Sequence, residues 1–162
     1  MRARIAAIAL AAGLVHDVRA EPAPVADETE CKKLGGNWLD LTTRGCMLAG
    51  RREGIWTARY PSGQVMTRDT YVRGERTGPS IGFHINCRAR ERGKLVAGTQ
   101  EGQWATWGRS GERLDEGSYK AGSREGVWKF YEDNVQTLEG PMVGDSANGT
   151  FTEWFASGTK WR

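Results

Sequence analysis

A glycine that recurs about every 24 residues is the feature that most constrains the fold of this 162-residue chain. The repeat glycines are Gly54, Gly78, Gly102, Gly126 and Gly149, with spacings of 24, 24, 24 and 23 residues. Self-similarity of this length is typical of repeat architectures, in which one supersecondary unit stacks on the next. The sequence therefore predicts five stacked units over residues 51–162.

Aromatic residues follow the repeat glycines at fixed distances. Two residues after them lie Trp56, Ser80, Trp104, Trp128 and Phe151, and five residues after them lie Arg59, Phe83, Trp107, Tyr131 and Trp154. Short aromatic runs between glycine-containing turns are typical of β-hairpins. The 22 glycines of the chain also disfavour a helical bundle, because each costs a helix interior about 1 kcal/mol. We predict an all-β fold, an open single-sheet array of antiparallel hairpins with a period of about 24.

The aromatic residues are expected to form most of the core of this array. The set is Trp56, Trp104, Trp107, Trp128, Tyr131, Phe151 and Trp154. A single sheet buries little else, and each large ring covers some 150–250 Å². The alternative is a stacking platform for a carbohydrate or a peptide. Side chains three positions apart point to opposite faces of a flat strand, so either both faces are partly covered or a bulge intervenes.

The first 30 residues look like a leader and a tether. Residues 1–20 have the layout of a secretory signal peptide, with a basic start, an 11-residue apolar run and small residues, Val18 and Ala20, at the −3 and −1 positions of a cleavage site. That run is shorter than the ~18 residues that span a bilayer. The mature chain is expected to be exported, periplasmic or extracellular, without a transmembrane segment. Residues 21–30 are acidic and proline-bearing, which predicts a flexible linker.

Two cysteines bracket the next segment. In an exported chain Cys31 and Cys46 are expected to form a disulfide, which closes an N-terminal loop at residues 31–50, outside the repeats. Such a bond contributes on the order of 3 kcal/mol by restricting the unfolded chain. Trp38 gives the loop a side chain that packs on the domain. Cys87 is left over, either as a buried thiol or as a partner for another chain.

The repeat units resemble a known family. Segments such as REGIWTARYPSGQ, QEGQWATWGRSGE and REGVWKFYEDN, joined by linkers such as TYVRGERTG, resemble the MORN repeat in the variant typical of bacterial YwqK-type antitoxin-like proteins. The resemblance covers residues 51–162 and implies both the hairpin array and antitoxin activity against a partner toxin. The second unit departs from the pattern, with Ser80 in place of Trp and Cys87 in place of Gly. Its local geometry is therefore an open question.

Residues that carry catalytic or metal chemistry are scarce. His84 and Cys87 form the one pair that could suggest a nucleophile or half of a zinc site, but no third group or family motif accompanies them. Glu53, Glu101 and Glu125 each precede a repeat glycine and are expected to line a solvated edge. We expect no enzymatic activity, no cofactor and no metal.

Arginine is concentrated in the first two repeat units. Residues 51–94 hold ten Lys or Arg against four acidic residues, whereas residues 95–162 hold seven against ten. This imbalance either serves solubility alone or forms a patch for an anionic partner. Arginine favours bidentate contact with phosphate or carboxylate groups. The candidate anion-binding set is Arg59, Arg68, Arg73, Arg76, Arg88, Arg90 and Arg92.

The sequence as a whole favours an exported, non-catalytic binding or scaffold protein. Its partner is expected to be another protein or an anionic component of the cell envelope. Nucleic acid is not expected, because the chain is exported and the mature charge is close to neutral. The alternative is an antitoxin or immunity protein, which the leader disfavours because toxins of this kind act in the cytoplasm.

Overall fold

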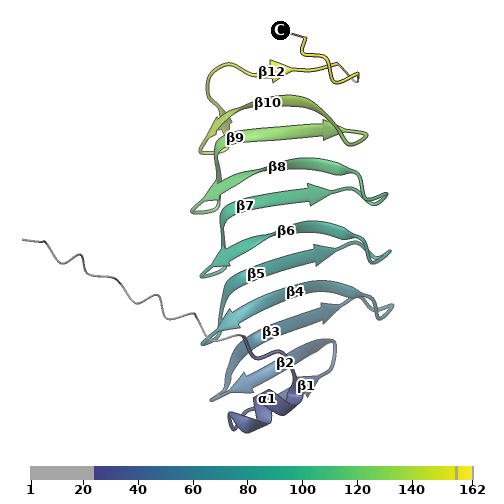
Figure 1. The fold of residues 1–162 in the computed structure, drawn as a ribbon. Coiled ribbons are helices and arrows are strands. Elements are labelled where there is room, and N and C mark those ends of the chain that lie inside the picture. Colours follow the sequence, from purple (N-terminus) through teal and green to yellow (C-terminus); the bar gives the residue numbers. More distant parts are fainter. Residues whose placement is uncertain (1–23, 156, 162) are drawn as a thin grey trace, which may run out of the picture.

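The computed structural model describes residues 24–155 and 157–161, and it forms one antiparallel sheet with a short helix at its first edge (Figure 1). The strands follow one another in chain order from β1 to β11, and β12 pairs with β10. The predicted all-β open array of antiparallel hairpins is confirmed. The signal peptide predicted for residues 1–20 lies outside the described residues. The elements are α1 (Glu28–Lys33), β1 (Asn37–Asp40), β2 (Thr43–Leu48), β3 (Arg51–Arg59), β4 (Val65–Val72), β5 (Glu75–Phe83), β6 (Ala89–Val96), β7 (Thr99–Trp107), β8 (Arg113–Lys120), β9 (Ser123–Glu132), β10 (Val135–Val143), β11 (Ser146–Ala147) and β12 (Thr152–Glu153).

Tight turns with positive φ close the hairpins at one end of the strands. Between β6 and β7, Ala97 has φ 49° and Gly98 has φ 82°. Two successive residues with positive φ define the two-residue turn whose twist matches that of the paired strands. The same combination closes the β4–β5 and β8–β9 hairpins. The repeat of Gly at the second turn position therefore has a direct conformational cause.

Longer turns close the β3–β4, β5–β6 and β7–β8 hairpins at the other end, whereas a two-residue turn, Asp133 and Asn134 with φ 48° and 66°, closes β9–β10. The second unit keeps the longer turn. In the first unit the amide of Tyr60 donates to the carbonyl of Gln64 at 2.8 Å. In the second unit the amide of His84 donates to the carbonyl of Arg88 at the same distance. Cys87 takes the position of the usual glycine, with φ 66°. The departure from the repeat pattern therefore changes the residue and leaves the turn in place.

The core is built by tryptophan rings that lie against glycines of the preceding strand. Trp104 is 4% exposed, and a Cβ built on Gly93 would lie 2.2 Å from its ring. The indole Nε1 of Trp104 donates to the carbonyl of Lys94 at 3.1 Å, which satisfies the buried donor. The same ring-on-glycine contact pairs Trp56 with Gly45, Trp128 with Gly117 and Phe151 with Gly140. One aromatic ring and one glycine therefore form the packing unit of this sheet.

A bulge at each repeat glycine accommodates this contact. Between β6 and β7, Arg92 pairs with Ala105 and Lys94 pairs with Glu101, so three residues of β7 lie opposite the single residue Gly93. The first of these three is Gly102, with φ 69°. Extra residues in one strand bend it locally, and positive φ at the bulge favours glycine. The 24-residue glycine period thus marks the position of the bulge.

The aromatic set divides between the two faces of the sheet. We call the side that carries Trp56, Trp104 and Trp128 the tryptophan face, and these rings are 3%, 4% and 1% exposed. Trp107 and Tyr131 follow three residues later, point to the opposite side and are half-buried. Both faces are therefore partly covered, which is the first of the two alternatives left open by the sequence. Phe151 and Trp154, close to the end of the chain, are also half-buried.

The predicted flexible linker at residues 21–30 is wrong for its described part, residues 24–30. Val25 is 5% exposed, and its carbonyl accepts a hydrogen bond from the amide of Ile55 at 2.8 Å. Asp27 caps α1, because its Oδ1 accepts from the amide of Glu30 at 2.8 Å. One buried apolar side chain and one backbone hydrogen bond, neither of which produces periodicity, attach this segment to the sheet.

The predicted disulfide between Cys31 and Cys46 is confirmed. Both cysteines are fully buried, and Val25 and Trp38 pack around them. The segment 31–50 is nevertheless more than a closed loop outside the repeats. It forms the β1–β2 hairpin, and β2 pairs with β3, so the segment extends the same sheet. The reason is that β2 supplies Gly45, the glycine on which Trp56 packs.

Candidate functional site

Three exposed arginines form a row across the strands on the side opposite the tryptophan face. The strand register pairs Arg44 with Thr57, Thr57 with Arg68, Arg68 with Ile81, and Ile81 with Arg92. Arg44, Arg68 and Arg92 are therefore placed on every second strand, about 10 Å apart along the sheet. All three are exposed. We call this side the arginine face.

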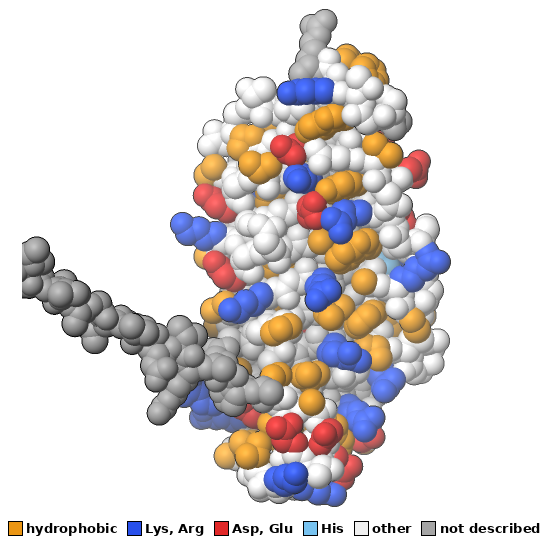
Figure 2. Space-filling view, viewed as in Figure 1, with side chains coloured by type: hydrophobic (Ala, Val, Ile, Leu, Met, Phe, Trp, Pro, Cys, Tyr) orange, Lys and Arg blue, Asp and Glu red, His pale blue; other side chains and the backbone are white. Residues whose placement is uncertain are grey.

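The row changes sign further along the sheet. Arg92 pairs with Ala105, Ala105 with Glu116, Glu116 with Lys129, and Lys129 with Glu139. Glu116 and Glu139 thus occupy the positions that arginine has in the earlier units. Figure 2 shows one face of the molecule on which basic side chains recur along the stack, with hydrophobic side chains between them. Two of the three arginines of the row, Arg68 and Arg92, lie in the basic units predicted from composition.

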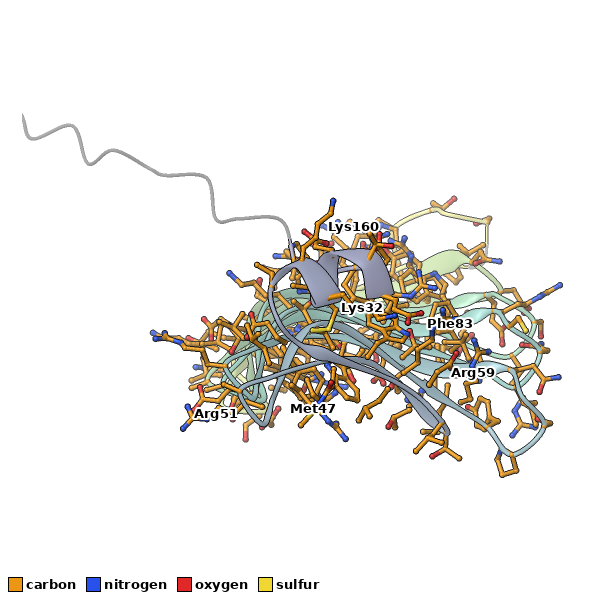
Figure 3. All side chains as sticks on the ribbon, turned by 90° about the horizontal axis from the view of Figure 1, so that it is seen from below. Lys32, Met47, Arg51, Arg59, Phe83 and Lys160 are labelled. Atoms are coloured by element: carbon orange, nitrogen blue, oxygen red, sulfur yellow. A yellow bond between two sulfur atoms is a disulfide. The ribbon has the colours of Figure 1, made fainter. Side chains whose placement is uncertain are left out.

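An open groove of about 400 Å³ adjoins the first two arginines of the row. It lies between residues 26–27, which precede α1, and side chains of β1 to β4. Figure 3 shows the labelled Lys32 of α1 and Met47 on opposite sides of the sheet. The lining combines aliphatic and hydroxyl side chains with three arginines, one carboxylate and one indole. The lining residues are Ala26, Asp27, Trp38, Arg44, Ile55, Thr57, Arg59, Val65 and Arg68.

The polar groups of this groove are poorly satisfied within the protein. The buried indole Nε1 of Trp38 has no hydrogen-bond acceptor among the described residues. Arg44 lies over the Trp38 ring at 5.6 Å, and its ion pair with Asp40 is long at 3.8 Å and solvent-exposed. Arg68 makes no ion pair or side-chain hydrogen bond within the described part of the chain. An acceptor-rich anionic ligand would pair with the exposed guanidinium groups of Arg44 and Arg68, whereas the Trp38 Nε1 is buried away from the groove surface.

The seven arginines predicted as an anion-binding set do not form one patch. Arg59, Arg68 and Arg92 lie on the arginine face. The guanidinium of Arg76 points to the tryptophan face, where it pairs with Asp69 at 3.0 Å. A hydrogen bond with Glu91 raises the pKa of Arg90, against the opposing effect of burial.

The two remaining arginines of the set, Arg73 and Arg88, lie at hairpin turns. Sequence reasoning missed Arg44, because it was assigned to a loop outside the repeats. The signal was present, since Arg44, Arg68 and Arg92 are spaced by 24 residues.

His84 and Cys87 have structural surroundings. The Nε2 of His84 lies 2.8 Å from the carbonyl oxygen of Trp107 in the next hairpin, and Cys87 is an exposed free cysteine in the turn. Glu53 and Glu101, expected along a solvated edge, accept hydrogen bonds from turn amides of the following hairpin at 2.7 and 2.9 Å. Across residues 24–155 and 157–161 no cluster of three or more metal-ligating side chains occurs.

Two further findings bear on the class of protein. In the part of the chain that the structure describes, no helix has the length and apolar character needed to cross a membrane. No protein-family model matches the chain, and no curated protein matches it. The resemblance to the MORN repeat and the antitoxin activity that it implies therefore stay predictions.

Proposed function

We propose that this protein is an exported, non-catalytic binding module that holds an extended anionic chain along its arginine face. The observation that carries the proposal is the row of Arg44, Arg68 and Arg92, exposed at every second strand and repeated with the period of the fold. A periodic row of guanidinium groups matches a polymer whose phosphate or carboxylate groups recur along its length. Export is supported by the disulfide, because such bonds persist in oxidising compartments.

The groove at the first edge supports a defined end to this binding path. Arg44, Arg59 and Arg68 line it, and of these Arg59 already donates a hydrogen bond to the carbonyl of Gly63 at 2.8 Å. The reversal of sign at Glu116 would repel an anionic chain, so the bound segment is expected to extend from the groove to Arg92. Because only one end of the array attracts an anionic chain, the ligand is directed to that end of the sheet.

The test compares two triple variants of the full chain with the same net charge. Arg44→Ser, Arg68→Ser and Arg92→Ser remove the row, whereas Arg51→Ser, Arg73→Ser and Arg109→Ser remove three exposed arginines elsewhere. The probes are poly-glutamate, inorganic polyphosphate and phosphatidylglycerol vesicles, at low and physiological salt. We expect the native protein and the second variant to bind a soluble polyanion, and the variant without the row to lose this binding. The affinity should fall steeply with salt, because exposed charges are screened within ~8 Å.

Equal loss of binding in both variants would reduce the row to a contribution to net charge and contradict the proposal. Binding to vesicles with none to the soluble polymers would contradict the extended-chain ligand and assign the face to a membrane surface. Absence of binding to every probe at low salt would leave the arginines as a solubility feature.

A further inference from the structure

The second hairpin unit breaks the ring-on-glycine packing at both of its members. Ser80 occupies the place of the tryptophan, and Asp69 on the preceding strand occupies the place of the glycine. Both are buried, at 5% and 7% exposure. The Ser80 hydroxyl donates to Oδ1 of Asp69 at 2.6 Å, and Arg76 donates to the same oxygen at 3.0 Å. A side chain at position 69 would collide with an indole at position 80, so the two changes belong together.

This paired change opens a hollow on the tryptophan face. Its volume is about 430 Å³, whereas the hollow beside Trp56, where the ring is in place, measures about 40 Å³. The larger value falls in the range of small-ligand sites. The side chains that matter for recognition are Arg76, Ser80, Glu91, Leu95, Gln100 and Trp104.

The charges at the hollow are already paired within the protein. Arg76 pairs with Asp69 at 3.0 Å, and Glu91 pairs with Arg90 at 2.7 Å. A charged ligand would therefore have to compete with an existing ion pair. What the hollow offers is a mixture of donors and acceptors, with an amide from Gln100 beside the guanidinium and the carboxylate. Hydroxyl groups both donate and accept, so a ligand with several hydroxyls fits this mixture.

The rest of the lining is formed by Gly98, Thr99 and Gly122 together with two apolar side chains, Leu95 and Trp104. Only 5% and 4% of the surfaces of Leu95 and Trp104 are exposed. A pyranose ring carries a rim of hydroxyls, which matches the donors and acceptors of the hollow, and a few C–H groups, which can contact the exposed edges of Leu95 and Trp104. We propose that this hollow binds one ring of a neutral carbohydrate. The site lies on the face opposite the arginine row, so the test of carbohydrate binding is independent of the proposed anion-binding function.

The test rebuilds the standard packing unit. The double variant Asp69→Gly with Ser80→Trp restores glycine and tryptophan, which fills the hollow and preserves the fold. The probes are cellohexaose, maltohexaose and N-acetylchitohexaose, together with N-acetyltryptophanamide as a mimic of an aromatic side chain. Titration is followed by calorimetry and by the indole N–H signals in two-dimensional NMR, and Gln103→Ala, on the opposite face, serves as the control variant.

We expect the full-length protein to bind at least one oligosaccharide with Kd tighter than about 10 mM and to shift one indole signal on titration. The rebuilt variant should bind at least about tenfold more weakly while its melting temperature stays equal or rises, and the control should bind as the native protein does. If the rebuilt variant does not fold, Gln100→Ala provides the same comparison, because it removes one lining amide from a partly exposed position.

Three results would overturn the proposal. The first is the absence of saturable binding to all three oligosaccharides. The second is undiminished binding by a folded rebuilt variant, which would place the sugar elsewhere. The third is a preference for N-acetyltryptophanamide over every sugar, which would assign the hollow to an aromatic side chain of a protein partner.

Discussion

The indole of Trp104 lies directly against Gly93 on the neighbouring strand, so closely that a Cβ at position 93 would come within 2.2 Å of ring carbons. The contact explains how a single sheet with little else in its core can bury three tryptophans almost completely. It also couples two positions that are eleven residues apart, because neither the ring nor the glycine can change alone.

Gly93→Ala should therefore destabilise the protein. Overpacking a fitted core costs typically 1–3 kcal/mol, and here the ring must move away from the strand, so we expect a loss of about 2 kcal/mol. The measurement is the free energy of unfolding in urea. Gly82→Ala is the control, because its Cβ would meet the partly exposed side chains of Glu91 and Arg90, at 2.7–3.0 Å, instead of a buried ring. Equal effects of the two substitutions would argue against the ring-on-glycine contact.

Removal of the ring itself should cost more. We expect Trp104→Ala or Trp128→Ala to lower the free energy of unfolding by ~3–5 kcal/mol, because each leaves a large cavity. Trp161→Ala, at a residue that is 58% exposed, should change stability by less than about 0.5 kcal/mol. Small losses at the two buried tryptophans, accompanied by weaker ligand binding, would instead indicate a surface platform.

The disulfide should stabilise the first edge of the array. Replacing Cys31 and Cys46 together by serine is expected to lower the free energy of unfolding by about 3 kcal/mol, the value expected for a loop of this length. Cys87→Ser should have no comparable effect, since this cysteine is exposed and free. Peptide mapping without reductant gives an independent check, and free thiols at both Cys31 and Cys46 in oxidised protein would contradict the assignment.

Cys87→Gly should stabilise the second unit. Cys87 has φ 66°, a conformation that costs residues with a Cβ roughly 1 kcal/mol and costs glycine little. We expect a gain of about 0.5–1 kcal/mol in the free energy of unfolding, reduced in part by the greater freedom of glycine in the unfolded chain. Comparison with Cys87→Ala isolates the backbone effect, because both substitutions remove the thiol. A gain of the same size from alanine would show that the turn carries no strain.

Tyr131 should make the protein sensitive to alkaline pH. Burial, and then the hydrogen bond from its hydroxyl to Glu116, raise the pKa of Tyr131 above the model-peptide value of 10.0. The folded state thus holds the phenolic proton at a pH where the unfolded chain has lost it, so stability falls as pH rises above about 10. Tyr131→Phe should show a smaller loss of the free energy of unfolding as pH rises above about 10, measured by urea titration. An identical alkaline loss in both proteins would contradict this role.

The repeat period, the hairpin architecture and the disulfide were all predictable from the sequence, because each rests on local chemistry. Glycines at positive φ, aromatic residues between turns and a pair of cysteines 15 residues apart leave signals that depend on spacing alone. The ordered segment around Val25 and the pairing of β2 with the array left no such signal. One buried side chain and one backbone hydrogen bond attach that segment, and neither has a period.

The composition of the candidate sites was decided by strand register. The sequence showed an excess of arginine near residues 51–94, but only the register separates Arg68 and Arg92, on the arginine face, from Arg76, which is paired with Asp69 on the other. A shift of one residue moves a side chain to the opposite face of a sheet. Because a bulge occurs at each repeat glycine, the face of a side chain cannot be assigned by counting residues along the sequence. The sequence by itself thus determined which unit is repeated, whereas the tertiary structure decided which charges share a surface and where the missing ring leaves space.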